Sequence, residues 1–148
     1  MSVVVDANLV AAVILPLPYR PQARAKVLAW NQAGEELTSP TLMEYEVCST
    51  IRRVTLAGWV TADEAREALA QMRRLGIQAV PPTVELHRAA LEWAHRLQRS
   101  RTYDAQYMAL AEELRADLWT CDLALFHKAR QLGIAWVHSV LAPSAPPA

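Results

Sequence analysis

The first eight residues contain three consecutive valines, Val3 to Val5, followed at once by Asp6. Valine is branched at Cβ and favours the extended backbone of a strand. A continuous apolar run is typical of a strand covered on both faces, as in a parallel sheet. Asp6 would then stand at the carboxyl end of that strand, where open α/β sheets bind their ligands. Taken alone, Asp6 could equally cap a helix that begins at Ala7.

The rest of the chain alternates between segments of helical periodicity and short apolar segments, without hairpin signals. Pro16 ends the first helical segment, and Pro18 and Pro21 are expected to keep the next residues irregular. This alternation predicts a parallel sheet with helices on both faces. The predicted helices span residues 7–15, 22–33, 40–57, 61–75, 83–98, 102–115 and 123–132, and the later strands span residues 35–38, 77–80, 118–121 and 135–138.

Two helix starts have recognisable signals. Ser39 and Pro40 resemble an N-cap followed by proline at the first helical position. Thr61 and Glu64 fit a capping box. The two helices over residues 61–75 and 83–98 are amphipathic, and their predicted inward faces consist of Ala65, Leu69, Met72 and Leu75, and of Leu86, Ala90, Trp93 and Leu97.

The length and charge of the chain limit what it can be. Its 148 residues fit one domain, and 53% of them are hydrophobic, which suffices for one core. The 15 basic and 15 acidic residues cancel, so no strong overall field attracts polyanions. Nucleic-acid binding would therefore depend on local patches or on a metal ion. We expect one domain over residues 1–141 and a flexible proline-rich tail over residues 142–148.

Cys48 and Cys121 lie far apart, without the spacing of a metal site. We expect two buried free thiols, which fits a reducing compartment. The amino terminus does not resemble a signal peptide, because Asp6 interrupts the apolar run and no basic segment precedes it. The longest apolar run, residues 9–15, is too short to span a bilayer. These features predict a soluble cytoplasmic protein that does not bind membranes.

Three aspartates stand where helices and strands begin or end. Asp6 and Asp122 each follow a predicted strand, and Asp104 lies in the first turn of the helix over residues 102–115. The alternative role for Asp104 is interaction with the helix dipole, worth ~0.3–1 kcal/mol. Because the carboxyl ends of parallel strands share one edge of a sheet, these side chains are candidates for a common site.

Two glutamates compete for a place in the same site. Glu44 and Glu46 are two positions apart, so on a helix they point about 200° apart. Glu44 already has a structural role, because Thr41 and Glu44 fit a capping box. Glu46 has none and adjoins the apolar stripe at Val47. We therefore assign Glu46 to the pocket.

Several carboxylates in one pocket raise one another's pKa values and cost stability unless a cation is present. Oxygen ligands without thiolates suit Mg²⁺ or Mn²⁺. The histidines form no zinc-binding pattern and are expected to lie on the surface or in the core; they are His87, His95, His127 and His138. The acidic set therefore predicts a site for a hard divalent ion.

Four segments together resemble the PIN-domain family, in particular its small VapC-type toxin ribonucleases. These segments are Val5 to Asn8, Pro40 to Val47, Thr102 to Tyr107 and Trp119 to Asp122. Their order and spacing match over nearly the whole chain. The resemblance implies a three-layer α/β/α sandwich with a central parallel sheet.

By position, four acids resemble the family's residues around a divalent metal: Asp6, Glu46, Asp104 and Asp122. Thr120 matches a Thr or Ser that precedes the last acid, and Asn8 matches a polar residue after the first; both would support the site. Ser49 departs from the pattern, because many relatives carry asparagine there. The departure affects only a supporting contact.

The resemblance implies a Mg²⁺- or Mn²⁺-dependent endoribonuclease, the toxin of a type II toxin–antitoxin pair. It would hydrolyse RNA phosphodiester bonds and leave 5′-phosphate and 3′-hydroxyl ends. The implied partners are the RNA substrate, an antitoxin protein whose tail occupies the acidic groove, and a second copy of the chain.

Other functions remain open. The chain could be a PIN scaffold that acts through protein contacts, although an intact set of four acids argues against it. A phosphoryl-accepting receiver domain normally carries paired acids after its first strand and a lysine after a late strand. A haloacid-dehalogenase-like phosphatase would need an aspartate where Asn8 stands. Both phosphoryl-transfer readings fit poorly.

Basic and aromatic residues near the acids have two interpretations. The basic ones could grip phosphates or simply face solvent: Arg52, Arg53, Arg99, Arg101, Lys128 and Arg130. Trp59 and Trp119 could stack on bases, although an apolar strand makes Trp119 a better candidate for the core.

Overall fold

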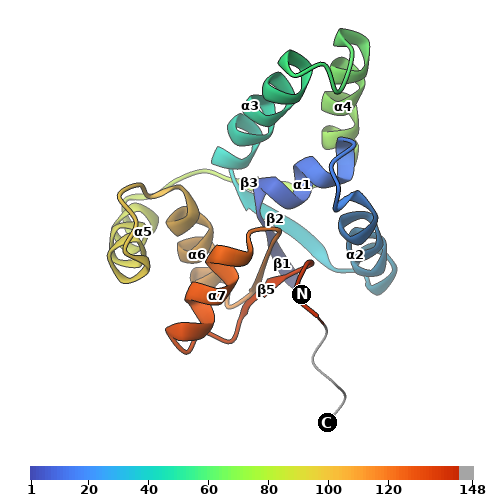
Figure 1. Ribbon diagram of the computed structural model, residues 1–148. Coiled ribbons are helices and arrows are strands. Elements are labelled where there is room, and N and C mark those ends of the chain that lie inside the picture. Colours follow the sequence, from blue (N-terminus) through green and yellow to red (C-terminus); the bar gives the residue numbers. More distant parts are fainter. Residues whose placement is uncertain (144–148) are drawn as a thin grey trace.

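The computed structural model describes residues 1–143 of the chain. The five strands of this part form one sheet in the order β3-β2-β1-β4-β5, and every neighbouring pair is parallel (Figure 1). The strands are β1 (Ser2–Val5), β2 (Glu36–Pro40), β3 (Gln78–Val80), β4 (Asp117–Thr120) and β5 (Val137–Ser139).

Helices cover both faces of this sheet. In Figure 1, α1 to α4 lie on one side of the sheet and α5 to α7 on the other. The three-layer α/β/α sandwich predicted from the sequence is therefore confirmed. The helices are α1 (Ala7–Ile14), α2 (Arg20–Ala33), α3 (Leu42–Leu56), α4 (Ala62–Arg74), α5 (Val84–Leu97), α6 (Tyr103–Leu114) and α7 (Leu123–Gln131).

The order of the strands reverses at β1. The chain runs from β1 outward to β2 and β3, then crosses the sheet to β4 and β5 on the other side of β1. Connections on either side of this reversal leave on opposite faces, which opens a crevice at the carboxyl end of β1. Asp6 follows β1 directly, so the topology places it at this crevice.

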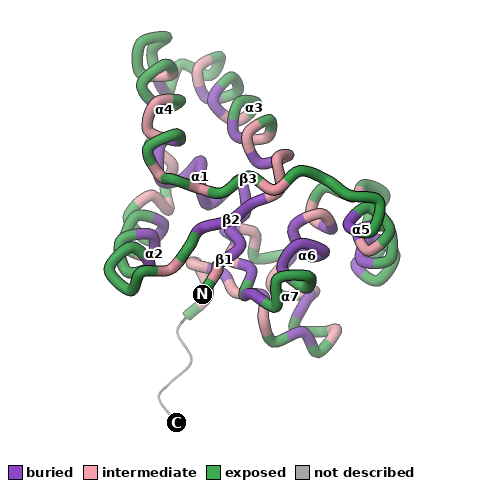
Figure 2. Tube along the Cα trace, turned by 180° about the vertical axis from the view of Figure 1, so that it is seen from behind, coloured by how far each residue is buried: buried purple, intermediate pink, exposed green. Residues whose placement is uncertain are grey.

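The apolar run that opens the chain is buried as predicted. Val4 and Val5 are almost inaccessible, and so are most residues of α1 and half of those of α6, two helices that pack on opposite faces of the sheet. Figure 2 shows this buried zone along the central strands, while the outer faces of α4 and α5 are exposed. The predicted inward face of α5 is buried at all four positions: Leu86, Ala90, Trp93 and Leu97.

The predicted helix start at Ser39 and Pro40 is wrong. Both residues belong to β2, which pairs with β3 up to the match of Pro40 with Val80. Ser39 is buried, and its hydroxyl donates to the carbonyl of Val5 at 2.6 Å. Pairing along two neighbouring strands overrides the local capping signal.

Two other local predictions near helix starts are wrong. Thr41 does occupy the N-cap of α3, but its side chain makes no capping bond, and Glu44 lies 3.7 Å from Arg73 of α4 instead. Pro21 lies in the first turn of α2, where its missing N–H costs nothing, and not in an irregular segment. The capping box of Thr61 and Glu64 is confirmed.

The inward face predicted for the helix over residues 61–75 is confirmed in part. Met72 is buried, and the half-buried Ala65 and Leu75 pack against the core. Leu69 is exposed instead, and the neighbouring Ala68 is buried in its place. No helix of the described part, residues 1–143, is long and apolar enough to cross a membrane. Residues 144–148 of the predicted tail lie outside the described part.

The cysteines differ in accessibility. Cys121 is buried just beyond β4, whereas Cys48 is exposed on α3, which contradicts the prediction that both thiols are buried. Burial, with the nearby Asp6 carboxylate, raises the pKa of the Cys121 thiol to about 12. Thiolate is the reactive form of cysteine, so Cys121 is doubly protected.

We therefore predict that a disulfide exchange reagent at pH 8 modifies one thiol per folded chain rapidly. Unfolding in urea should expose the second. A Cys48→Ser variant should lose the fast phase, which a spectrophotometric thiol assay detects. Two fast thiols in the folded wild type would contradict the burial of Cys121.

Candidate functional site

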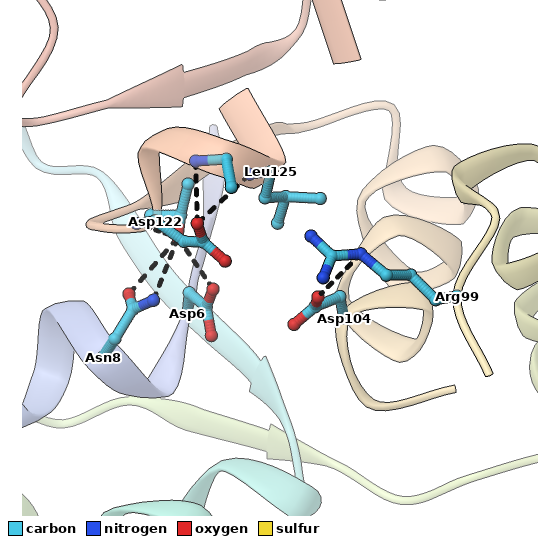
Figure 3. Close-up of polar contacts among 8 residues, drawn as sticks. Asp6, Asn8, Arg99, Asp104, Asp122 and Leu125 are labelled. Carbon is cyan, nitrogen blue, oxygen red and sulfur yellow. Dashed lines mark hydrogen bonds and ion pairs between the residues drawn. The ribbon is translucent and has the colours of Figure 1, made fainter. Parts of the chain in front are cut away.

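The four predicted acids converge on the carboxyl end of the sheet from four different elements. Asp6 follows β1, Glu46 lies on α3, Asp104 lies in the first turn of α6, and Asp122 follows β4 at the N-cap of α7. Figure 3 shows the carboxyl groups of Asp6, Asp104 and Asp122 facing a common space. The sheet thus brings together acids that are up to 116 positions apart.

Thr120 joins two of these acids. Its hydroxyl donates to Oδ2 of Asp6 at 2.8 Å and accepts from the backbone N–H of Asp122 at 2.9 Å. Because the hydroxyl is wholly buried, both bonds are sheltered from water. Thr120 therefore fixes the spacing of Asp6 and Asp122. Its role in supporting a metal site stays a prediction.

Asn8 secures the same junction from the first turn of α1. Its Nδ2 donates to the hydroxyl of Thr120 at 3.2 Å, and its Oδ1 accepts from the backbone N–H of Cys121 at 2.9 Å. The amide thus ties the start of α1 to the end of β4. The two acids stand at the same places, because Asp6 directly precedes α1 and Asp122 follows β4, the strand that pairs with β1. Asn8 thus contacts residues beside the acids, while its role in supporting a metal site stays a prediction.

Asp122 is held by the helix that follows it. Its Oδ1 accepts from the backbone N–H groups of Ala124 and Leu125, at 2.8 and 3.2 Å (Figure 3). These bonds cap the N-terminus of α7. Since both bonds go to one oxygen, Oδ2 is left for a further partner.

Glu46 is held by a residue that the sequence analysis did not assign. The hydroxyl of Tyr107 donates to Oε1 of Glu46 at 2.7 Å, and the Tyr107 ring is fully buried. Tyr107 lies one turn after Asp104 on α6, so it reaches across to α3. Tyr107 belongs to one of the segments that carry the family resemblance, Thr102 to Tyr107. No signal in the sequence around it, however, indicated that its hydroxyl would contact Glu46.

Burial and mutual repulsion keep three of the acids from ionising easily. Burial raises the pKa of Asp6 to about 7; the bond from Thr120 opposes this, and the charges of Asp104 and Glu46 add to it. Burial also raises the pKa of Glu46 and of Asp104. The charge of Asp104 raises the pKa of Glu46 further, and that of Asp122 raises the pKa of Asp104. The four carboxyl groups therefore form one electrostatically linked set.

Two arginines border this set. Arg99 and Arg101 line a pocket of about 230 Å³ together with Glu46 and Asp104. The Nε atom of Arg99 lies 3.9 Å from Oδ2 of Asp104, and its charge partly offsets the rise that burial causes in the pKa of that carboxyl group. A cationic rim beside an acidic floor is suited to a phosphate group that also meets a metal ion.

Three of the other basic and aromatic candidates have contacts of their own outside the acidic set: Lys128, Arg130 and Trp119. Lys128 donates to Gln98, and Arg130 donates to the backbone carbonyls of Ile134 and Ala135. Trp119 packs against the core, with its ring stacked 4.8 Å from that of His138, as the strand pattern predicted.

The chemistry of this set fits a hard divalent cation. Its donors are carboxylate oxygens, and the buried Asp6 is the group that most needs a positive partner to ionise. Within residues 1–143, however, no three His, Cys, Asp or Glu side chains already stand close enough together to hold one ion. Binding would therefore require the carboxylates to draw closer together.

Residues 3–131 match the family model described as the PIN domain, and the chain belongs to the PIN-domain family. It is similar to a VapC ribonuclease of Mycobacterium bovis, with 36% identity over 123 residues, 83% of this chain and 87% of the relative. It is also similar to ribonuclease VapC3 of Pyrobaculum aerophilum, with 31% identity over 132 residues, 86% of this chain and 95% of the relative. The predicted resemblance to VapC-type proteins is confirmed.

Solved structures agree with the fold. VapBC2 of Rickettsia felis, bound to a promoter DNA fragment, matches with a TM-score of 0.67 and 10% identity, over 94% of this chain and 98% of that one. A toxin–antitoxin complex of Klebsiella pneumoniae matches with a TM-score of 0.63 and 16% identity, over 93% and 97%. At these identities the matches establish the architecture alone.

The central role of the Thr120 hydroxyl predicts a stability cost when it is removed. Thr120→Val keeps the side-chain volume but leaves Asp6 and the backbone N–H of Asp122 without a partner, so unfolding should become easier by about 1–3 kcal/mol. Thr38→Val is a matched control, because the Thr38 hydroxyl is buried on β2 without a hydrogen-bond partner among the described residues.

Urea denaturation of both variants at pH 7.5 gives the comparison. Thr38→Val should be neutral or stabilising. Equal losses in the two variants would show that the Thr120 hydroxyl does not hold the site together.

The raised pKa of Asp6 predicts how stability depends on pH without divalent ions. Between about pH 4 and 7 the folded chain holds a proton on Asp6 that the unfolded chain has lost. The contribution of Asp6 to the free energy of unfolding therefore falls as pH rises through this window, by roughly 1.4 kcal/mol per pH unit at most.

Urea denaturation in EDTA at pH 5 and pH 7.5 tests this. The wild type should lose more stability between the two pH values than Asp6→Asn, which cannot titrate. Parallel pH profiles of the two proteins would contradict the assignment.

Proposed function

We propose that the chain is a metal-dependent endoribonuclease, the toxin of a type II toxin–antitoxin pair. It would hydrolyse RNA phosphodiester bonds with Mg²⁺ or Mn²⁺ held by Asp6, Glu46, Asp104 and Asp122. The observation that carries this proposal is the buried Asp6 carboxyl group, whose pKa is raised by burial and by the nearby acids. Clustered carboxyl groups cost the fold stability when they ionise, unless a cation neutralises their charges. The names of the VapC ribonuclease relatives support the same reading.

The chain's own residues would prepare the site for this chemistry. Thr120 and Asn8 set the distance between the ends of β1 and β4, and Tyr107 fixes Glu46 on α3. Arg99 and Arg101 would approach the phosphate from the rim. A bound divalent ion would lower the pKa of a water molecule and neutralise charge that develops on the phosphate.

The same proposal includes the partners expected from the resemblance. An antitoxin protein would cover the acidic groove, and two copies of the chain would form a homodimer. The two free cysteines fit a cytoplasmic location. The alternative, a PIN scaffold that binds proteins without significant nuclease activity, is separated from the proposal by a cleavage assay.

We predict that the purified chain, free of antitoxin, cleaves structured RNAs into discrete products with Mg²⁺ or Mn²⁺ and not with EDTA. Asp6→Asn and Asp104→Asn should each reduce cleavage by at least 100-fold, because electrostatic stabilisation of the reacting phosphate contributes on this scale. Gel analysis of labelled RNA measures the products.

Asp63→Asn provides the matched control, because Asp63 is an exposed acid of α4. It should retain full activity. Cleavage that persists in both site variants would indicate a contaminating nuclease. No cleavage of a broad RNA panel by the folded, metal-loaded chain would favour the protein-binding alternative.

Metal binding has a readout that does not depend on activity. At pH 7.5, Mn²⁺ should raise the midpoint of thermal unfolding of the wild type, because a ligand that binds only the folded chain stabilises it. The rise should be much smaller in Asp6→Asn and unchanged in Asp63→Asn, as measured by differential scanning calorimetry. An equal rise in all three proteins would place the ion elsewhere.

A further inference from the structure

A second pocket, of about 370 Å³, opens beside the acidic one. It lies where β2 and β3 end, between the first turns of α3, α5 and α6. Buried Leu86 and Leu110 contribute to its lining, together with the aromatic side chains of Tyr45 and Tyr103. The pocket is therefore mainly apolar, although it adjoins a group of carboxylates.

The two pockets share one lining side chain. Tyr103 lines both the apolar pocket and the pocket that contains Glu46 and Asp104. The sequence repeats this arrangement, because Tyr45 directly precedes Glu46 and Tyr103 directly precedes Asp104. A group bound in the apolar pocket would thus lie next to a phosphate bound at the acids.

Both tyrosines are unusually exposed. Tyr45 is 74% and Tyr103 52% accessible, whereas Tyr107 on the same helix as Tyr103 is 1% accessible. Packing therefore does not account for tyrosine at positions 45 and 103. An accessible aromatic ring in the first turn of a rigid helix is a suitable surface for stacking, because little freedom remains to be lost when a flat partner binds.

Polar groups in the pocket can distinguish between partners. Nε2 of Gln106 lies 3.2 Å from Nδ1 of His87, so each of these side chains restrains the other. A glutamine amide offers both a donor and an acceptor, which is the pattern needed to read the edge of a base. Both residues line the pocket, near the tyrosine rings.

We propose that this pocket binds one unpaired nucleobase of the RNA, next to the phosphate that is cleaved. The base would stack on Tyr103 and Tyr45, and Gln106 and His87 would contact its edge. Proteins that recognise single-stranded RNA bind splayed bases in this way. Arg99 and Arg101 line the acidic pocket together with Tyr103, so they would meet the neighbouring phosphate there. This inference rests on the proposed ribonuclease function. It adds that the pocket would determine which base the nuclease prefers beside the cleaved bond.

Kinetics on an RNA that the wild type cleaves test the pocket. Tyr103→Ala and Tyr45→Ala should each raise KM roughly fivefold or more, the scale of one lost base–aromatic stack, with little change in kcat. Tyr103→Phe keeps the ring and should restore KM. Leu91→Ala, at an exposed position of α5 that does not line the pocket, is the control and should behave as wild type.

A second set of substrates identifies the base. An abasic nucleotide is placed in turn at each position that flanks the cleaved bond. At one position, removal of the base should raise KM for the wild type but cause no further rise for Tyr103→Ala. Gln106→Ala should weaken the preference for one base over the others at that same position.

The outcomes separate the two proposals. If the folded, metal-loaded wild type cleaves no RNA, the ribonuclease function itself fails. If it cleaves RNA and the tyrosine variants match Leu91→Ala, only the base pocket is wrong. If sedimentation velocity shows that the tyrosine substitutions convert a dimer into monomers, with equal effects for every abasic position, the pocket is an interface between two copies and the inference is overturned.

Discussion

The arrangement of the site depends on the pairing of β1 with β4. These strands are neighbours in space, although more than 110 positions separate them in the chain, and an acid stands within two residues after the end of each. Thr120 bridges the two ends through one buried hydroxyl, which donates to Asp6 and accepts from the backbone of Asp122. The order of the strands reverses at β1, and a doubly wound sheet leaves a crevice open at such a reversal. The Thr120 bridge lies in that crevice.

The acidic cluster opposes the stability of the fold that holds it. Burial and repulsion raise the pKa values of Asp6, Glu46 and Asp104, so each costs more to ionise here than it would in water. Only groups that the rest of the structure holds in place can stay in such a position. Thr120 and Tyr107 provide that restraint through hydrogen bonds to Asp6 and Glu46. A carboxylate site assembled without them would relax by turning its acids toward water.

The alternation of helical and apolar segments predicted a parallel sheet with helices on both faces, and the places of Asp6 and Asp122 followed from one topological rule. Glu46 and Asp104 lie on helices, so placing them beside these two acids needed helix geometry and the resemblance to the PIN-domain family. The sequence mispredicted Ser39 and Pro40, because their strand pairing with β3 involves residues 40 positions away. It could not assign Tyr107 to Glu46, since the distance between two helices on different layers is set by packing and not by spacing along the chain.

Helix geometry links the acidic pocket to the apolar one. Consecutive residues of a helix point about 100° apart, so one turn of α3 can present Glu46 to one pocket and Tyr45 to the other. The first turn of α6 does the same with Asp104 and Tyr103. An insertion ahead of either helix would rotate both side chains together and disturb the acids along with the aromatic surface. Changes in base preference are therefore expected to arise by substitution at positions 45, 103 and 106, which leaves the phase of both helices and the carboxylate geometry intact.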